Sequence, residues 1–258
     1  MTAPQVIRSV AAWQKLRRGP EFFGKTVGLV PTMGALHAGH AELLRRAAKE
    51  NDIVVMTLFV NPTQFNDPKD LDRYPRDLEK DLKIVAETGG HYVLMPEPAE
   101  MYADEYRYEV REKKLSRILE GEHRPGHFEG VLTVVLKLLA LARADRAYFG
   151  EKDYQQLELV RGLVAAFFID TQIVAVPTVR DTDGVALSSR NVLLTPEQRK
   201  QAALFPELLK SDLSVDEIRK RLEKTGFIVD YVEDNKEMGR RLGAIQLGKV
   251  RLIDNFKI

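Results

Sequence analysis

Apolar runs and amphipathic helical patterns alternate along the first two thirds of the chain. The apolar runs that predict buried strands are residues 27–30, 53–60, 92–95, 147–149 and 173–179. Helical periodicity occupies residues 39–50, 78–88, 128–143 and 154–168. Continuous apolar strands separated by helices are typical of a parallel sheet with helices on both faces. The pattern therefore predicts an α/β fold with a doubly wound parallel sheet.

The pattern changes after Asp181-Thr182-Asp183-Gly184, a turn signal that we take as the domain boundary. Beyond this turn, residues 195–198 and 214–217 resemble capping boxes that open helices. Alternating and hairpin-like patterns predict short strands at residues 227–232, 244–247 and 251–253. We therefore expect a larger domain over residues 1–184 and a smaller C-terminal α+β domain over residues 185–258, with a hinge near Gly184.

The 258 residues carry 39 Lys and Arg against 38 Asp and Glu, so the net charge is only +1. This balance gives no support to a nucleic-acid or membrane-surface partner. The absence of cysteine excludes disulfides, thiolate nucleophiles and cysteine-based zinc sites. The best apolar run, residues 131–142, is interrupted by Lys137 and is too short to cross a bilayer. The basic first twenty residues predict a short amphipathic helix rather than a transit peptide, so we expect a cytoplasmic protein.

The stretch Thr32-Met33-Gly34-Ala35-Leu36-His37-Ala38-Gly39-His40 lies between a predicted strand and a predicted helix. A strand, a glycine-containing turn and a helix in this order direct backbone N–H groups and the positive end of the helix dipole towards one point, which favours an anion. His37 and His40 could hydrogen-bond the phosphates of a nucleotide bound there. The structural alternative is one capping histidine and one surface histidine.

A second set of phosphate-binding side chains follows the predicted boundary, in Leu187-Ser188-Ser189-Arg190-Asn191. Together with the two histidines, its hydroxyls and guanidinium suggest an enzyme that cleaves ATP between the α and β phosphates. The segment Phe149-Gly150-Glu151-Lys152-Asp153-Tyr154-Gln155-Gln156 follows another predicted strand and opens a helix. Lys152 is unfavourable at the positive end of a helix dipole unless a polyphosphate, or its neighbours Glu151 and Asp153, neutralise it.

Two further loops carry polar side chains that suit a small acidic substrate. Phe59-Val60-Asn61-Pro62-Thr63-Gln64-Phe65 follows the second strand, and the carboxyl ends of parallel strands meet at one edge of a sheet. The neutral amides of Asn61 and Gln64 suit a hydroxy acid, and a proline turn with solvated amides is the alternative. Arg124-Pro125-Gly126-His127-Phe128 could supply an anion contact, or only a cap and a turn.

Candidate metal ligands are few. Asp77 and Asp81 are spaced four residues apart on one predicted helix, so both carboxylates share a face. Such a pair could contact Mg²⁺, although a solvated helix face is the ordinary alternative. The histidine pair has no third ligand nearby in the sequence, which favours a phosphate site over a metal site.

As a set, these motifs resemble the pantothenate synthetase (pantoate–β-alanine ligase) family over nearly the whole chain. The resemblance lies in Pro31–His40, Phe59–Phe65, Arg124–Phe128, Phe149–Gln156 and Leu187–Asn191. A lone His-x-Gly-His motif would indicate only the wider nucleotidyltransferase superfamily, which includes class I aminoacyl-tRNA synthetases. The resemblance implies a Rossmann-like catalytic domain and a small C-terminal domain that closes over ATP, usually in a homodimer.

The resemblance also implies a reaction in two halves. A carboxylate oxygen of pantoate attacks the α phosphate of Mg-ATP, which gives pantoyl adenylate and pyrophosphate, and the amine of β-alanine then displaces AMP. By the same likeness His40 is the catalytic acid, with His37 and Lys152 beside it on the leaving pyrophosphate. The residues implied to bind ATP are Met33, Gly34, Ala35, Leu36, His37, Ala38, Gly39, His40, Gly150, Glu151, Lys152, Asp153, Val179, Leu187, Ser188, Ser189 and Arg190.

The same likeness assigns residues to the two smaller substrates. Gln64 and Gln156 resemble the glutamines that hold pantoate, and Gln64 also lies near β-alanine in the family. Asn61 and Arg124 complete the substrate contacts that we predict, and Asp81 is the predicted contact for Mg²⁺. The partners expected are therefore ATP, pantoate, β-alanine and a second copy of the chain.

The chain departs from the family pattern after Asn191, where its connections around residues 209–214 and 234–242 are short. Two rival functions stay open. Another adenylyl- or cytidylyltransferase on this fold would need no paired glutamines, and a nucleotide sensor would not need Lys152 and Arg190 on the leaving phosphates. Pyrophosphate release from ATP with pantoate, with and without β-alanine, distinguishes the three functions.

Overall fold

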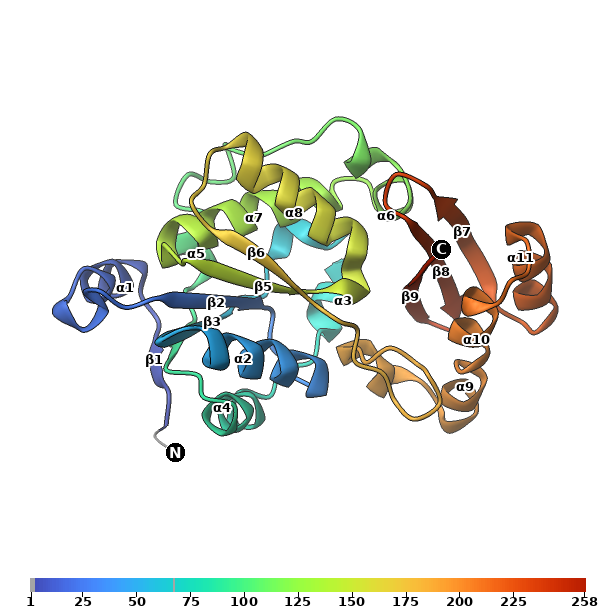
Figure 1. Ribbon diagram of the computed structural model, residues 1–258, viewed down its shortest axis with the longest axis horizontal. Coiled ribbons are helices and arrows are strands. Elements are labelled where there is room, and N and C mark those ends of the chain that lie inside the picture. The colour runs from blue at the N-terminus through green and yellow to red at the C-terminus, as the bar shows by residue number, and fades with distance from the viewer. Residues whose placement is uncertain (1–2, 67) are drawn as a thin grey trace. The chain divides into compact units, whose positions relative to one another are not determined.

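The computed structural model describes residues 3–66 and 68–258 (Figure 1). The chain forms two compact units. The first unit comprises Met1–Gly150 and Gln155–Val176, and the second comprises Glu151–Tyr154 and Pro177–Ile258. Each unit has its own sheet and its own apolar core.

The sheet of the first unit is parallel throughout. In the described part of the chain its strands are β1 (Gln5–Ile7), β2 (Val27–Thr32), β3 (Ile53–Leu58), β4 (Tyr92–Leu94), β5 (Arg146–Gly150) and β6 (Gln172–Val176). They are arranged in the order β1-β4-β3-β2-β5-β6. The chain therefore builds the sheet outwards from β2 through β3 and β4, and then returns to the other side of β2 to add β5 and β6. This is the doubly wound parallel sheet that the apolar pattern predicts, and the expected fold class is confirmed.

Helices cover both faces of this sheet. The helices in the described part of this unit are α1 (Val10–Arg17), α2 (Ala38–Glu50), α3 (Pro68–Arg73), α4 (Leu78–Glu87), α5 (Pro98–Met101), α6 (Glu120–His123), α7 (His127–Ala142) and α8 (Tyr154–Ala166). Helices α2 and α4 lie on one face, and α7 and α8 lie on the opposite face (Figure 1). Val30 and Met56 point from β2 and β3 to the first of these faces, where they pack with Leu44 of α2 and Val85 of α4. Among the described residues, no helix is both long and apolar enough to cross a membrane.

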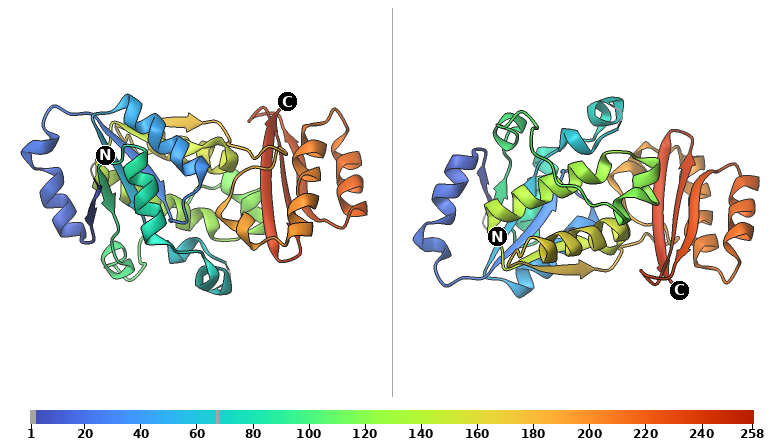
Figure 2. Two further views of the ribbon diagram at one scale, coloured as in Figure 1. Left: turned by 90° about the horizontal axis from the view of Figure 1, so that it is seen from below. Right: turned by 90° about the horizontal axis from the view of Figure 1, so that it is seen from above.

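The second unit is a small antiparallel sheet with helices on one face (Figure 2). Its elements are α9 (Pro196–Gln201), α10 (Leu204–Lys210), α11 (Val215–Lys224), β7 (Ile228–Asn235), β8 (Arg240–Leu247) and β9 (Val250–Lys257). Phe205 and Leu209 of α10 and Leu222 of α11 pack with Ile245 of β8 and Leu252 of β9. The α+β architecture that we expect for the C-terminal region is therefore present, with strands longer than the sequence pattern indicates.

The capping box at residues 195–198 and the hairpin turn at residues 248–249 are confirmed, whereas at residues 214–217 only the N-cap bond of the predicted capping box is present. The side chain of Thr195 accepts from the backbone N–H of Gln198 at 3.2 Å, and the backbone N–H of Thr195 donates to Oε1 of Gln198 at 3.1 Å, which makes a capping box at the start of α9. Ser214 accepts from the N–H of Glu217 at 3.3 Å at the start of α11. Gly248 has a φ of +63° in the two-residue turn that joins β8 to β9, a conformation that glycine adopts without strain.

The turn at residues 181–184 lies inside the second unit and does not divide the two units. The guanidinium of Arg199 pairs with both Asp181 and Asp183. Arg180 donates to the carbonyl of Gly184 at 2.9 Å and forms a bridge with Ala186. The hydrogen bond from Arg199 is the main cause that lowers the pKa of Asp183. These contacts fix the turn. The second unit resumes at Pro177, and the domain division expected after residue 184 and the hinge expected near Gly184 stay predictions.

Candidate active site

The carboxyl ends of β2 and β5 mark the point where the first sheet changes direction of growth. β2 pairs with β3 on one side and with β5 on the other. In doubly wound sheets, ligands bind at the carboxyl ends of strands at such a switch point, because the loops that follow the two strands diverge there. The loop after β2 carries the histidine motif, so this motif lies at the position where a nucleotide site is expected.

His37 and His40 together cap the N-terminus of α2. The backbone N–H of Gly39 donates to Nδ1 of His37 at 3.1 Å, and the backbone N–H of His37 donates to Nδ1 of His40 at 3.4 Å. The centroids of the two rings are 4.1 Å apart. A Cβ on Gly39 would lie 2.9 Å from the ring of His37, so only glycine lets this ring fold back over the helix end. Both histidines therefore cap the helix, whereas the structural alternative expects one capping and one surface histidine; their contact with phosphate stays a prediction.

Capping also fixes the chemistry of the two rings. Because each Nδ1 accepts a hydrogen bond, each neutral imidazole carries its proton on Nε2. His37 and His40 therefore each contribute an Nε2–H donor beside the backbone N–H groups of the first turn of α2. The positive end of the helix dipole adds to this field. Such a set of donors is suited to the oxygens of a phosphate chain.

The loop that precedes α2 is held by a buried carboxylate. Asp81, on α4, is 1% exposed. Its Oδ2 accepts from the N–H of Ala35 at 3.0 Å and its Oδ1 from the N–H of Leu36 at 2.7 Å. Ala35 has a φ of +52° and Gly34 a φ of +85°, so the loop uses the left-handed region twice in succession. We infer that the two bonds to Asp81 stabilise this unusual backbone.

The surroundings of Asp81 correct one interpretation of the sequence. The solvated helix face is wrong for this residue, because burial is the main cause that raises its pKa and its carboxylate faces the loop. Asp77 instead caps α4, where its side chain accepts from the N–H of Lys80. The described residues contain no group of three or more His, Cys, Asp or Glu side chains that could hold a metal ion. A contact between Asp81 and Mg²⁺ stays a prediction, and the structure gives this carboxylate another function.

Replacing Asp81 with asparagine is expected to destabilise the protein by about 1–3 kcal/mol at neutral pH, because one of the two buried N–H groups loses its acceptor. Burial raises the pKa of Asp81, so folding favours its protonated form. Protonation of Asp81 therefore adds to the unfolding free energy of the wild type. This addition is fully present below pH 3.8, the ordinary pKa, and it is lost as the pH rises through the higher pKa of the folded protein. Denaturant unfolding of both proteins between pH 4 and pH 8 tests this, and a stability difference that does not change with pH would contradict it.

The loop after β3 presents Gln64 from a rigid support. Asn61 is 1% exposed, and its Nδ2 donates to Oε1 of Gln64 at 3.2 Å and to the carbonyl of Gly130 at 3.1 Å. Its Oδ1 accepts from the hydroxyl of Tyr102 at 2.6 Å. The solvated-amide alternative is therefore wrong for Asn61. Gln64 in turn donates to the sulfur of Met33 at 3.0 Å, so the loops after β2 and β3 meet as expected.

Tyr102 is a residue of this network that sequence reasoning missed. Its ring is buried, and the ammonium of Lys137 lies 4.3 Å from the ring centroid. Burial is the main cause that raises the pKa of its hydroxyl, which stays a donor at neutral pH. Tyr102 directly follows α5, where the sequence shows no strand, turn or motif signal. Its function is to hold Asn61 and thereby Gln64.

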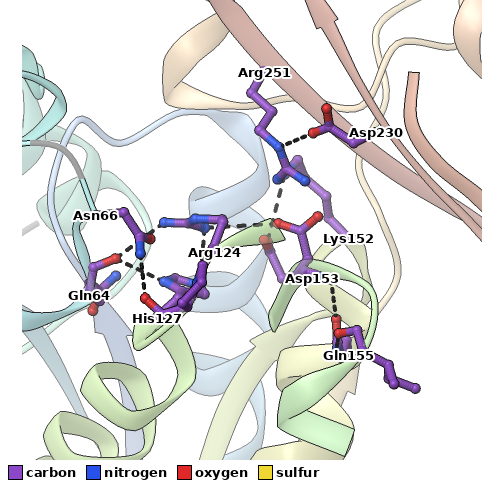
Figure 3. Close-up of polar contacts among 12 residues, drawn as sticks. Gln64, Asn66, Arg124, His127, Lys152, Asp153, Gln155, Asp230 and Arg251 are labelled. Atoms are coloured by element: carbon purple, nitrogen blue, oxygen red, sulfur yellow. Dashed lines mark hydrogen bonds and ion pairs between the residues drawn. The ribbon is translucent and has the colours of Figure 1, made fainter. Parts of the chain in front are cut away.

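Arg124 and His127 hold the same loop from the other side (Figure 3). Arg124 donates from Nη2 to the carbonyl of Gln64 at 3.2 Å, and Nδ1 of His127 lies 2.9 Å from the same oxygen. Since a carbonyl only accepts, the proton of His127 is on Nδ1, and its Nε2 can accept from Nη1 of Arg124 at 3.1 Å. Asn66 adds a bond to the carbonyl of Pro125. The sequence predicts Arg124 as a substrate contact, and the structure shows it as a support of Gln64.

The two adjacent glutamines at the start of α8 differ in their surroundings. Gln155 is buried, and its Nε2 donates to the carbonyls of Leu115 and Ile118 at 2.7 and 2.8 Å. Its Oε1 accepts from the N–H of Glu120, so the whole amide is used to fix the segment before α6. Gln156, which we predict to hold pantoate, is half-buried in the first turn of α8. Its role stays a prediction.

In the second unit, Lys152 lies in a 3-10 turn formed by Glu151–Asp153, directly before α8. Its ammonium nitrogen is 3.8 Å from Oδ2 of Asp153, which is longer than a hydrogen bond. Glu151 is paired instead with Arg240, at 3.0 Å. Only one of the two acidic neighbours expected to neutralise Lys152 therefore does so.

The other candidate ATP contacts of the second unit gather around one backbone bond. The N–H of Leu187 donates to the carbonyl of Val179 at 3.0 Å. Ser188 caps the following 3-10 turn, Ser189–Leu193, by accepting from the N–H of Arg190 at 3.3 Å. Asn191 donates to the carbonyl of Ala186 at 3.0 Å. Val179 and Leu187, which the turn at 181–184 separates in the sequence, are thus adjacent, and the contacts of these residues with ATP stay a prediction.

The first unit has the features of a nucleotide-binding α/β enzyme, with paired histidines on a helix N-terminus at the switch point of a parallel sheet. Comparison with known proteins gives the family. Residues 5–257 match the profile of the family described as pantoate-beta-alanine ligase. The chain belongs to this family, whose members are amide-forming ligases that use ATP.

Relatives and solved structures agree with this assignment. The chain is 51% identical to the pantothenate synthetase of Bdellovibrio bacteriovorus over 254 residues, which cover 98% of this chain and 99% of the relative. A pantothenate synthetase of Coxiella burnetii is 50% identical over 252 residues, or 98% and 96% of the two chains. The pantoate-beta-alanine ligase of Francisella tularensis, solved with beta-gamma ATP and beta-alanine, has a TM-score of 0.94 at 40% identity and covers 99% of this chain and 98% of its own. The pantothenate synthetase of Thermus thermophilus has a TM-score of 0.89 at 40% identity, with 98% and 99% covered.

Proposed function

We propose that the protein condenses pantoate with β-alanine at the expense of ATP. In the first half-reaction a carboxylate oxygen of pantoate bonds to the α phosphorus of ATP, and the bond to the bridging oxygen of pyrophosphate breaks. In the second, the amine nitrogen of β-alanine bonds to the activated carbonyl carbon, loses a proton and expels AMP. The products are pantothenate, AMP and pyrophosphate, and Mg²⁺ enters as part of the substrate Mg-ATP.

The observation that carries this proposal is the pair of imidazoles on the N-terminus of α2. Displacement at phosphorus needs little covalent help from a protein, so that positioning and charge stabilisation account for most of the catalysis. Negative charge grows on the departing pyrophosphate, and the Nε2–H groups of His37 and His40 are donors that can meet it. The beta-gamma ATP and beta-alanine bound in the Francisella tularensis structure support the same substrates here.

We assign the candidate residues of each unit to a substrate. In the first unit, Met33–His40 and Gly150 contact ATP, with His40 as the acid, while Gln64 and Gln156 hold pantoate. In the second unit, Glu151–Asp153, Val179 and Leu187–Arg190 contact ATP, with Lys152 on the leaving pyrophosphate. Asn61 and Arg124 stay predicted substrate contacts, and their bonds to Gln64 support that residue in the same task.

The proposal is tested by isotope exchange between pyrophosphate and ATP. With pantoate and Mg²⁺ but without β-alanine, the protein is expected to catalyse the exchange, and addition of β-alanine should give stoichiometric AMP and pantothenate. Exchange with another acceptor in place of pantoate would favour a different adenylyl- or cytidylyltransferase. ATP binding without exchange under any of these conditions would favour a nucleotide sensor.

Replacing Gln64 with leucine is expected to raise the KM for pantoate by one to two decades and to change the KM for ATP little. A hydrogen bond to a charged group is worth about 1.5–3 kcal/mol, and the neutral amide can bond the hydroxyl and the carboxylate of pantoate. Gln172→Leu, an exposed glutamine of the same unit, is the matched control and should behave as the wild type. Equal losses for the two substrates would mean that the loop is only a scaffold.

We further propose that the protein is cytoplasmic and forms a homodimer, as the resemblance implies. Among the described residues, no helix could span a membrane, and this agrees with the first of these proposals. Sedimentation equilibrium of the purified protein tests the second. A single species with the mass of one chain, 29.3 kDa, at micromolar concentration would contradict it.

A further inference from the structure

The segment Glu151–Tyr154 is fixed by the last strand of the second unit. Asn255, on β9, donates from Nδ2 to the carbonyl of Glu151 at 2.8 Å and to the carbonyl of Lys152 at 3.0 Å. An amide NH₂ group has two hydrogens, and here each one bonds to one of two successive carbonyls. The backbone on both sides of the Cα of Lys152 is therefore tied to one side chain.

Arg240, on the neighbouring strand β8, holds the two ends of the same segment. Its Nη2 lies 3.0 Å from Oε2 of Glu151, and its guanidinium carbon lies 4.2 Å from the ring centroid of Tyr154. Arg240 is only 7% exposed, so loss of Glu151 would leave a nearly buried charge without this partner. Together with Asn255 it forms what we call the Lys152 bracket.

The side chain of Asn255 is costly for the stability of the fold. It is 4% exposed, and its Oδ1 meets no hydrogen-bond partner among the residues that the structure describes. A buried acceptor without a partner costs about 1–3 kcal/mol, which an apolar side chain of similar volume would avoid. The benefit of asparagine at this position thus lies in its two donated bonds, and both go to the segment of Lys152.

We propose that Asn255 and Arg240 are positioning residues for Lys152 in adenylate formation. They fix the backbone from which the ammonium group reaches the leaving pyrophosphate, and they touch neither substrate themselves. This inference rests on the proposed function, in which Lys152 contacts ATP. The new element is that the position of Lys152 depends on β8 and β9, two strands that lie at the far end of the chain.

The first test is Asn255→Asp, which keeps the size of the side chain and removes both donated hydrogens. Pantoate-dependent exchange between pyrophosphate and ATP is measured at saturating substrates. We expect kcat to fall by as much as about 100-fold, the scale for a catalytic group displaced by about 1 Å. The KM for pantoate should change much less than kcat, because Gln64 lies on another loop and Gln156 lies on α8, beyond the two carbonyls that Asn255 holds.

The matched control is provided by two adjacent arginines of β8. Arg240 and Arg241 are similarly buried, at 7% and 9% exposed, but Arg241 pairs with Asp234 and bonds the carbonyl of Ser211. Arg240→Met should slow the exchange, and Arg241→Met should leave its rate at the wild-type level. If both variants slow the exchange equally while remaining folded by circular dichroism, the effect is one of general stability and the proposal is wrong.

A double-mutant cycle separates this inference from the proposed function. In the Lys152→Ala background, Asn255→Asp should cause no further loss, because its effect passes through Lys152. If Lys152→Ala itself is as active as the wild type, the role of this lysine in the proposed function fails. If Lys152→Ala is slow but Asn255→Asp and Arg240→Met are both normal, or if the losses of Asn255→Asp and Lys152→Ala multiply, only the inference fails. If Asn255→Asp does not fold, the two arginine variants decide.

Discussion

Replacing His40 with alanine is expected to slow formation of pantoyl adenylate by roughly 10²- to 10³-fold, the usual effect of removing one donor to a developing negative charge. The imidazole uses Nδ1 to accept from the N–H of His37 and so keeps its proton on Nε2. Alanine removes both the cap and the donor. Single-turnover quench-flow with excess enzyme measures the step directly, and a near-normal rate would remove His40 from the mechanism.

His40→Glu is the control that separates the cap from the donor. Glutamate at this third position of a helix accepts from the N-cap N–H in ordinary capping boxes, so it should restore the stability that alanine loses. Its carboxylate offers no proton to a phosphate at neutral pH and repels it. We expect His40→Glu to unfold at the temperature of the wild type and to be at least as slow as His40→Ala. If His40→Glu regained activity together with stability, the only role of His40 would be to cap the helix.

Replacing Lys152 with alanine is expected to slow adenylate formation by a similar factor, roughly 10²- to 10³-fold, with a smaller effect on the attack of β-alanine. The charge that the ammonium stabilises departs with pyrophosphate, before the amine reacts. Quench-flow measures the first step, and mixing preformed pantoyl adenylate with the enzyme and β-alanine measures the second.

The control for this variant is Lys224→Ala, which removes an exposed lysine from the end of α11 in the same unit. It changes the net charge by the same amount and should leave both steps at their wild-type rates. If Lys152→Ala slows both steps equally, the lysine acts on overall structure or on binding of the adenylate, and its assignment to the leaving group is incorrect.

The apolar pattern predicts the first unit well because buried parallel strands are continuous apolar runs bounded by turn residues. Strands β2 to β6 and helices α2, α4, α7 and α8 all lie where the pattern predicts them, to within a few residues at each end. Strand β1 and helix α10 could not be predicted, because a three-residue edge strand and a seven-residue helix with Pro206 in its first turn carry too little periodicity. The strands of the second unit are longer than predicted, and in β8 the buried Arg240 and Arg241 break the apolar alternation at its start.

The motifs of the candidate site could be predicted from the sequence, but the residues that hold the motif loops in place could not. The histidine loop and the Asn61–Gln64 loop are local features, and their position follows from strand order. Asp81 and Tyr102 are joined to these loops by bonds that span 46 and 41 residues, and no spacing rule predicts such a bond. One signal for Asp81 was present: it lies four residues before Val85, on the face of α4 that packs into the core. A carboxylate on the apolar face of a helix is expected to be buried, and a buried carboxylate needs hydrogen-bond donors.

The bracket on Lys152 has a consequence for the time course of synthesis on the ribosome. The amide that fixes the carbonyl of Lys152 follows it by 103 residues. At a synthesis rate of about 5–20 residues per second, Asn255 is added roughly 5–20 s after Lys152. The strands around the histidine loop can already pair during this time. The nascent chain therefore acquires its nucleotide-binding sheet well before it can hold this lysine in place. Catalytic competence should emerge late and abruptly, when β9 joins β8.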